Sequence, residues 1–241
     1  MTFELGTNMA ARLLDMIGPA IVRGEYSDGG FPTEADATSM FGASRTVIRE
    51  AVKSLISKGL LESRTRVGTR VQPTDRWNIL DPDVIRWMID SPDPTAFLME
   101  FATFRKGVIP PAAGLAARFA SPSDMDSMES AFMKLKQASD QDSAASALYL
   151  FHEAVVEASG NPVHRRMHQT MAVVIRRLAR ASAEAGAIYP GHYAHVLNSI
   201  RVRDVIRAED AMRVALEEES NRLQAATETR PKARPVGSNA V

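Results

Sequence analysis

The segment from Ser44 to Gly59, SRTVIREAVKSLISKG, constrains the fold of this chain most. Its apolar residues recur at helical spacing and predict a helix with one buried face, formed by Val47, Ile48, Ala51, Val52, Leu55 and Ile56. The opposite face carries Arg45, Thr46, Arg49, Lys53 and Ser57. Arg45, Arg49 and Lys53 are four residues apart, so three cations share one surface that suits phosphates and guanine edges. A solvated charged face is equally compatible with this helix taken alone.

The residues before this helix predict its partners. A first helix is expected from Met9 to Val22, with Gly24 as its stop. Thr33 and Asp36 have the N-cap to N3 spacing of a capping box, at the start of a short helix Glu34 to Met40. Ser44 is placed to cap the helix that follows. Two short helices joined by a tight glycine-containing turn form a helix-turn-helix.

Two short strand-like pieces follow, Leu60 to Arg64 and Thr69 to Gln72. The turn between them, Arg66-Val67-Gly68, has a glycine that can take a left-handed conformation. These pieces predict a two-stranded wing; an ordinary hairpin with solubilising arginines is the alternative. Between Gly42 and Gln72 seven basic residues stand against two acidic ones, a local excess of +5 in a chain whose 29 basic and 29 acidic residues balance.

This N-terminal part resembles the GntR superfamily of bacterial transcription regulators over roughly residues 5 to 73. The resemblance rests on Phe31-Pro32-Thr33-Glu34, Ser44-Arg45-Thr46, Ile48-Arg49-Glu50-Ala51, Leu55 with Gly59-Leu60, and Gly68-Thr69-Arg70-Val71. It implies a winged helix-turn-helix that contacts DNA through Thr33, Ser44, Arg45, Thr46, Arg49, Lys53, Arg64, Arg66 and Gly68. Many members have an arginine where this chain has Ala35, so more of the readout is expected from Arg45, Arg49 and the wing.

Composition and hydropathy exclude several other classes of protein. The chain has no cysteine, which rules out disulfide frameworks and thiolate sites. It has no basic leader and no run of eighteen apolar residues, so a cytoplasmic protein without membrane insertion is expected. No catalytic constellation or Gly-rich phosphate loop is evident, so we expect a protein that is not an enzyme.

The remaining chain predicts a mainly α fold, with an antiparallel all-α bundle of six or seven helices after the winged helix-turn-helix. We expect domains at 1–73 and 96–226, a linker at 74–95 and a disordered tail at 227–241. The linker is expected to hold a short helix, Asp83 to Asp90, that packs the two domains together. The predicted bundle helices are Ala96 to Phe119, interrupted by Pro110-Pro111, then Ser123 to Ala138, Ser143 to Ala158, Val163 to Ala185, His192 to Val202 and Ala208 to Ala226.

The bundle resembles the ligand-binding domain of the FadR branch of that superfamily, known as the FCD domain. The matches are Phe104-Arg105, Pro110, Ala112-Ala113, Leu115-Ala116-Ala117, Phe151-His152-Glu153-Ala154-Val155, Ala158-Ser159-Gly160-Asn161-Pro162, Val196-Leu197, Ile200-Arg201 and Asp204. Trp77-Asn78, Leu80-Asp81 and Asp83-Val84 resemble a subset that includes galactonate-responsive repressors. Many members hold a divalent metal with one Asp and three His, and a carboxylate effector completes the shell.

This sequence departs from that metal pattern. The four ligand positions fall on Leu148, His152, Tyr193 and Ala215, and one imidazole does not make a transition-metal site. An alternative alignment uses His192 or His195, and His164 and His168 have the spacing that puts two imidazoles on one helical face. Without a third ligand such a pair is more often structural. We therefore expect a pocket without zinc, nickel or another cofactor.

The resemblance implies an effector site at Arg105, where a guanidinium can grip a carboxylate through two hydrogen bonds. Tyr149, His152, Asn161 and Tyr193 would add donors and acceptors for a hydroxyl-rich ligand. The alternatives are a structural salt bridge for Arg105 and a helix-terminating role for Asn161. The family often has a glutamate where this chain has Ile109.

The sequence thus predicts a homodimeric repressor that binds double-stranded DNA at a palindromic operator. A small organic acid, such as a sugar acid, is expected to release it. The alternative is a DNA-binding regulator whose bundle only dimerises and binds no effector.

Overall fold

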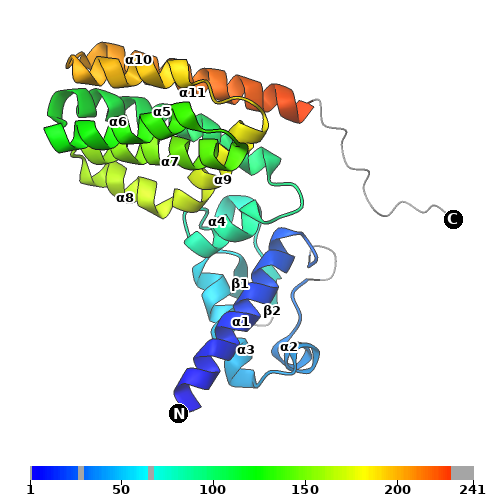
Figure 1. The fold of residues 1–241 in the computed structure, drawn as a ribbon. Coiled ribbons are helices and arrows are strands. Elements are labelled where there is room, and N and C mark those ends of the chain that lie inside the picture. The colour runs from blue at the N-terminus through cyan, green and yellow to red at the C-terminus, as the bar shows by residue number, and fades with distance from the viewer. Residues whose placement is uncertain (1, 27–29, 65–67, 229–241) are drawn as a thin grey trace. The chain divides into compact units, whose positions relative to one another are not determined.

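The computed structural model describes residues 2–26, 30–64 and 68–228, with side chains from residue 9 onward. Arg66 and most of the tail predicted to be disordered lie outside these ranges. The chain divides into two compact units, Met1–Pro94 and Thr95–Val241. Helices dominate both described units (Figure 1), which confirms the predicted mainly α fold class.

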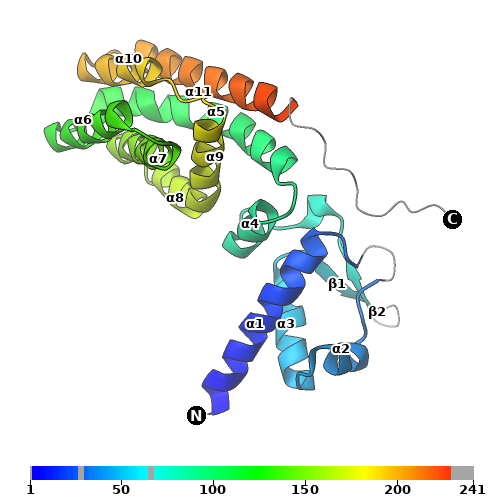
Figure 2. The ribbon, with the colours of Figure 1, turned by 45° about the vertical axis from the view of Figure 1, so that its right-hand side comes forward.

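The N-terminal unit is a winged helix-turn-helix. Its elements are α1 (Thr2–Val22), α2 (Glu34–Phe41), α3 (Arg45–Ser57), β1 (Leu61–Arg64), β2 (Gly68–Val71), the 3₁₀ turn η1 (Thr74–Arg76) and α4 (Pro82–Ile89). The helix α1 begins earlier than its apolar pattern indicated, and it lies against α3 (Figure 2). The strands pair antiparallel, with Leu61 opposite Val71 and Arg64 opposite Gly68, and form the predicted wing.

The predicted caps explain where α2 and α3 begin. The hydroxyl of Ser44 accepts from the amide of Val47 at 3.4 Å, and that of Thr33 accepts from the amide of Asp36 at 3.3 Å. The side chain of Asp36 accepts from the Thr33 hydroxyl at 2.6 Å. No contact of this carboxylate with the Thr33 backbone amide is seen in the described structure, so Thr33 and Asp36 form half of the predicted capping box.

The buried face of α3 is narrower than the sequence predicted. Ile48, Ala51 and Leu55 lie in the apolar core with Ile17 of α1 and Leu60, which precedes the wing. Val52 is half-buried, and Ile56 is 37% exposed. The helix α3 is therefore fixed along one stripe and leaves a broad outer surface.

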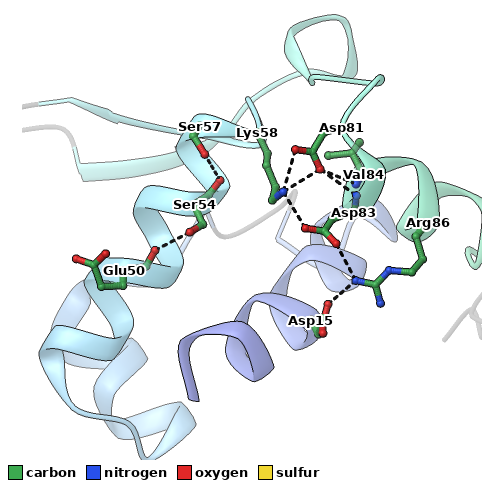
Figure 3. A network of polar contacts seen from close by, with 9 residues as sticks. All are labelled: Asp15, Glu50, Ser54, Ser57, Lys58, Asp81, Asp83, Val84 and Arg86. Carbon is green, nitrogen blue, oxygen red and sulfur yellow. Dashed lines mark hydrogen bonds and ion pairs between the residues drawn. The ribbon is translucent and has the colours of Figure 1, made fainter. Parts of the chain in front are cut away.

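Charged residues join the C-terminal end of α3 to α4 and α1 (Figure 3). The Lys58 Nζ lies 2.8 Å from Asp81 Oδ1 and 2.8 Å from Asp83 Oδ2. Arg86 Nη2 contacts the other oxygen of Asp83 at 3.1 Å and reaches Asp15 Oδ1 at 2.6 Å. Burial opposes the charge on Lys58, but its hydrogen bonds to both carboxylates outweigh burial and raise its pKa. The network therefore holds α4 against the end of α3.

The short helix α4 belongs to the core of the N-terminal unit. Val84 and Trp87 lie in the same apolar cluster as α1 and α3, and Trp87 packs so closely on Gly18 that a Cβ there would come within 2.5 Å of the indole. Asp81 caps α4, because its carboxylate accepts from the amides of Asp83 and Val84. The packing of α4 within this unit results from the burial of its apolar side chains. The proline-rich sequence around α4 does not indicate this packing.

The described C-terminal unit is an antiparallel helical bundle. Its helices are α5 (Thr95–Phe119), α6 (Pro122–Gln137), α7 (Gln141–Ala158), α8 (Pro162–Thr170), α9 (Ala172–Glu184), α10 (Pro190–Arg201) and α11 (Val205–Glu228). The long helices α5 and α11 run side by side, and α7 packs on α5, α6 and α9 (Figures 1 and 2). Ala112, Ala113, Ala116 and Ala117 let α5 approach its neighbours closely at the centre of the core.

Two predicted helix boundaries in the bundle are wrong. The prolines do not interrupt α5, which runs through Pro110 and Pro111 as one helix. Pro110 is buried, and packing against several neighbouring helices holds this segment despite the lost hydrogen bonds. Conversely, the single helix predicted from Val163 to Ala185 is divided at Met171, where φ is −98° and ψ is 10°. The residues around this break include neither glycine nor proline, so the sequence pattern gave no sign of it.

Two glycines near α3 test how closely the chain packs after the wing. Gly59 has a φ of +77°, and a Cβ there would lie 2.3 Å from the backbone oxygen of Arg76. Gly42 has a φ of +61° with nothing within 4 Å. Gly42→Ala is expected to cost about 1–2 kcal/mol of unfolding free energy, from the left-handed backbone alone. Gly59→Ala is expected to cost roughly 3 kcal/mol or more, because a backbone clash adds to it.

Urea unfolding followed by circular dichroism measures both costs. Equal losses for the two variants would contradict the close approach of Arg76 to α3.

Candidate DNA-binding face and buried polar cluster

The outer face of α3 and the wing gather most of the candidate DNA contacts. Ser44, Arg45, Thr46, Arg49 and Lys53 are exposed along α3, and Arg64 and Gly68 are exposed on the wing. Thr33 is exposed at the start of α2, where its side chain also serves as the cap. Arg66 lies outside the described residues. A cleft of about 160 Å³ lies between the wing, α3 and the start of α2, and Arg49, Lys53, Ser63 and Thr69 are among the residues that line it.

Carboxylates accompany these cations more closely than the sequence spacing indicated. Arg49 Nε lies 3.0 Å from Glu34 Oε1 of α2, and Lys53 Nζ lies 2.9 Å from Glu50 Oε1. On the wing, Arg64 pairs with Glu62 at 2.9 Å. All three pairs are solvent-exposed and therefore weak, so each can be exchanged for a phosphate contact at little cost. Three cations of this face, Arg49, Lys53 and Arg64, are thus held in position by weak pairs.

A second group of polar residues is buried inside the bundle, contributed by α5, α7, α9, α10 and α11. Arg105 Nη1 donates to Glu219 Oε1 at 3.4 Å, and Arg105 Nη2 lies 3.4 Å from His152 Nδ1. Glu219 also accepts from the hydroxyl of Ser182 at 2.6 Å and from that of Tyr193 at 2.9 Å. Arg105 is 4% exposed, Glu219 2%, and His152 and Tyr193 1% each. We call Arg105, His152, Ser182, Tyr193 and Glu219 the polar cluster.

The protonation of His152 follows from its neighbour. A guanidinium can only donate, so Nδ1 accepts the bond from Arg105 and the ring proton sits on Nε2. That Nε2 is buried and has no hydrogen-bond partner among the described residues. Burial, with the positive charge of Arg105, holds the pKa of His152 well below its usual range, while burial and Glu219 raise that of Tyr193 well above its own. Both side chains are therefore neutral, and the charges of Arg105 and Glu219 offset each other.

Two of the predicted effector residues are engaged elsewhere. Asn161 caps α8, since its side-chain oxygen accepts from the amides of Val163 at 2.9 Å and His164 at 3.3 Å. Tyr149 donates to Glu153 at 2.9 Å, and its ring packs under Arg176 and beside His168. Burial lowers the pKa of His168 to about 4. The structure thus gathers Arg105, His152 and Tyr193 and gives Asn161 a helix-capping role.

Glu219 and Ser182 are cluster members that the sequence reasoning missed. Glu219 lies on the apolar stripe of α11, in line with Met212, Ala215, Leu216 and Leu223. A carboxylate at a core position of an amphipathic helix signals a buried partner, because an unpaired one would be costly. That signal was available in the sequence. Ser182 offered none, because small hydroxyl residues are common in helix cores.

Sequence comparison identifies the two units. The family described as "Bacterial regulatory proteins, gntR family" matches residues 9–71, and the FCD domain matches residues 100–218. The galactonate operon transcriptional repressor of Escherichia coli strain K12 is 34% identical over 180 residues, which are 73% of this chain and 76% of that protein. The chain belongs to the GntR family of bacterial regulatory proteins. It is a DNA-binding transcription regulator of the FadR type and not an enzyme.

A further relative and a solved structure are also similar to this chain. A putative L-lactate dehydrogenase operon regulatory protein of Escherichia coli strain K12 is 30% identical over 185 residues, 75% of this chain and 70% of that protein. A GntR-family regulator from Pseudomonas syringae pv. tomato has a solved structure with a TM-score of 0.51, covering 92% of this chain and 86% of that one at 16% identity, which supports the fold. Among the described residues, no helix has the length and apolarity to cross a membrane.

The four metal positions that the resemblance to the FCD domain implies do not fit a metal in this chain. Leu148 and Ala215 are buried hydrocarbon side chains in the bundle core, and the hydroxyl of Tyr193 donates a hydrogen bond to Glu219. His195 is exposed, so the alternative alignment does not bring it to the cluster. Within the described residues no group of three His, Asp or Glu is arranged to hold an ion. Only His152 retains a ligand type at its position.

Metal titration tests this misfit. Zinc, nickel or a chelator is expected to move the melting temperature by less than about 1 °C, because an ion without a native site does not stabilise the fold. Differential scanning fluorimetry measures the shift. A metal-dependent rise of several degrees that His152→Ala abolishes would show that the cluster holds an ion after all.

Proposed function

We propose that this protein is a repressor that binds a short palindromic operator as a homodimer in the cytoplasm. The exposed basic face of α3, with the wing beside it, is the observation that carries the proposal. An α-helix of this kind fits the major groove, where arginine reads guanine and lysine contacts phosphate. Arg45 and Arg49 would read bases, while Lys53, Arg64 and the wing would contact the backbone. Ala35 offers no polar contact, which leaves more of the specificity to these arginines.

We infer the dimer from the small size of the winged helix-turn-helix. One small winged helix covers a half-site, and two copies related by a two-fold axis match a palindrome. The name of the relative that represses the galactonate operon supports the sign of regulation.

Substitution of the two arginines tests the DNA-binding face. Arg45→Ala and Arg49→Ala are each expected to lower the preference for operator over random DNA by about 10–100-fold, as the loss of a base contact does. Gel shifts with the DNA upstream of the protein's own gene, against random DNA, measure the ratio. Arg207→Ala removes an exposed positive charge from the bundle and is the control. If both arginine variants discriminate as well as the parent, α3 does not read the operator.

For the effector we propose a small hydroxylated carboxylic acid that binds the bundle and weakens operator binding. Galactonate and L-lactate, which appear in the names of two relatives, both carry a hydroxyl beside the carboxylate. The polar cluster has matching chemistry: Arg105 for the carboxylate, with His152 and Tyr193 for hydroxyl groups. The ligand would act by favouring an arrangement of the protein that fits the operator poorly.

The alternative is a bundle that only dimerises. It is favoured by the internal pairing of Arg105 with Glu219 and by the hydrocarbon side chains at two metal positions. Under this alternative the cluster is a structural feature of the core.

A thermal shift panel separates the two. Aldonates, uronates, dicarboxylates and L-lactate are added at millimolar levels, and saturation at about 100 times Kd would raise the melting temperature by roughly 5 °C. Gel shifts with each stabilising acid then test release from DNA. No stabilisation of the parent by any acid would favour the dimerisation module.

A further inference from the structure

Arg105 meets a carboxylate that the chain itself supplies. Glu219 of α11 contacts Arg105 of α5 across the bundle core, and both side chains are almost fully buried. The contact is long, 3.4 Å, while the bonds to Glu219 from Ser182 and Tyr193 are 2.6 and 2.9 Å. Glu219 is therefore held in place mainly by two hydroxyls and supplies its charge to the guanidinium.

This pairing limits what charge the cluster can accept. With His152 and Tyr193 neutral, one positive and one negative charge balance inside the core. A carboxylate that arrived at Arg105 would leave two negative charges against one guanidinium. An unbalanced buried charge is strongly unfavourable. An incoming acid therefore binds only if Glu219 takes up a proton or moves away from Arg105. The unpartnered Nε2 of His152, beside Arg105, is a further buried donor for such a ligand.

We propose that Glu219 is an internal carboxylate that competes with the carboxylate of the effector for Arg105, and so sets the affinity and charge selectivity of the bundle. This inference rests on the proposed acid effector. Exchange of one carboxylate for the other breaks the Arg105–Glu219 ion pair, which is one of the contacts between α5 and α11, and this is how occupancy of the cluster would alter the packing of two long helices.

The main test compares Glu219→Gln with the parent. Glutamine keeps the shape and removes the charge: its oxygen can accept from one of the two hydroxyls, Ser182 or Tyr193, and its NH2 group can donate to the other, which turns to accept. The variant is expected to bind the best acid of the thermal shift panel at least roughly tenfold more tightly than the parent, because Arg105 no longer has a competing anion. Calorimetric titration with D-galactonate, gluconate, glucarate and L-lactate measures Kd. Galactitol has the hydroxyl chain of galactonate without its carboxylate. Its Kd should differ by less than about threefold between Glu219→Gln and the parent.

Three further variants guard the test. Glu217→Gln removes an exposed carboxylate from the same helix and should leave every Kd unchanged. Ser182→Ala removes one bond to Glu219 while both charges remain, so it should tighten acid binding by a smaller factor, roughly twofold to fivefold. Glu219→Ala opens space beside Arg105, and acetate should raise its melting temperature more than chloride at equal ionic strength. Ser182→Ala and Glu219→Ala test the competition if Glu219→Gln folds poorly.

The outcomes separate this inference from the proposed function. The parent alone decides whether the bundle takes an acid, and the ratio of variant to parent decides the role of Glu219. Tighter acid binding by Glu219→Gln, with galactitol unchanged, supports the competition even if the parent binds no acid measurably. Equal or weaker acid binding by Glu219→Gln overturns it and leaves the acid effector in place. Binding by neither protein overturns both the competition and the acid effector, while operator binding is judged separately.

Discussion

A guanidinium buried among five helices is the constraint on which the arrangement of the bundle depends. Arg105 sits in a core made largely of alanine, leucine and valine, where an unpaired charge would be expelled. Glu219 balances it, and Ser182 and Tyr193 in turn satisfy Glu219. Because these partners come from separate helices, the cluster fixes how the helices face one another, which apolar packing alone specifies less strictly.

The N-terminal unit is under a different constraint. One face of α3 must be packed rigidly in the core, while the opposite face stays exposed. Ile48, Ala51 and Leu55 anchor α3 in the core, while its outer face carries charge. Lys58 fixes the far end of the helix through Asp81 and Asp83. Apolar burial and partly buried ion pairs thus hold α3 without using its outer surface.

Local chemistry in the sequence predicted a large part of this. The caps at Thr33 and Ser44, the wing and the helical content follow from spacing and turn residues, which act over a few positions. Long-range pairing was not predictable in the same way. Glu34 reaches Arg49 from another helix, and Glu219 reaches Arg105 across 114 positions. The break at Met171 and the continuity of α5 through Pro110 depend on tertiary packing that outweighs local preference. The DNA and effector contacts themselves remain predictions.

The pairing of Arg49 with Glu34 bears on how such a regulator would respond to ionic strength. A free basic side chain that meets DNA displaces condensed counterions, and each displacement steepens the fall of affinity with salt. A cation already paired within its own chain trades one anion for another, so Arg49, Lys53 and Arg64, if they contact DNA as proposed, would add less to that slope than their number suggests. Non-specific attraction to DNA would be weaker as well, so the shape and base pattern of the groove would account for a larger share of the discrimination.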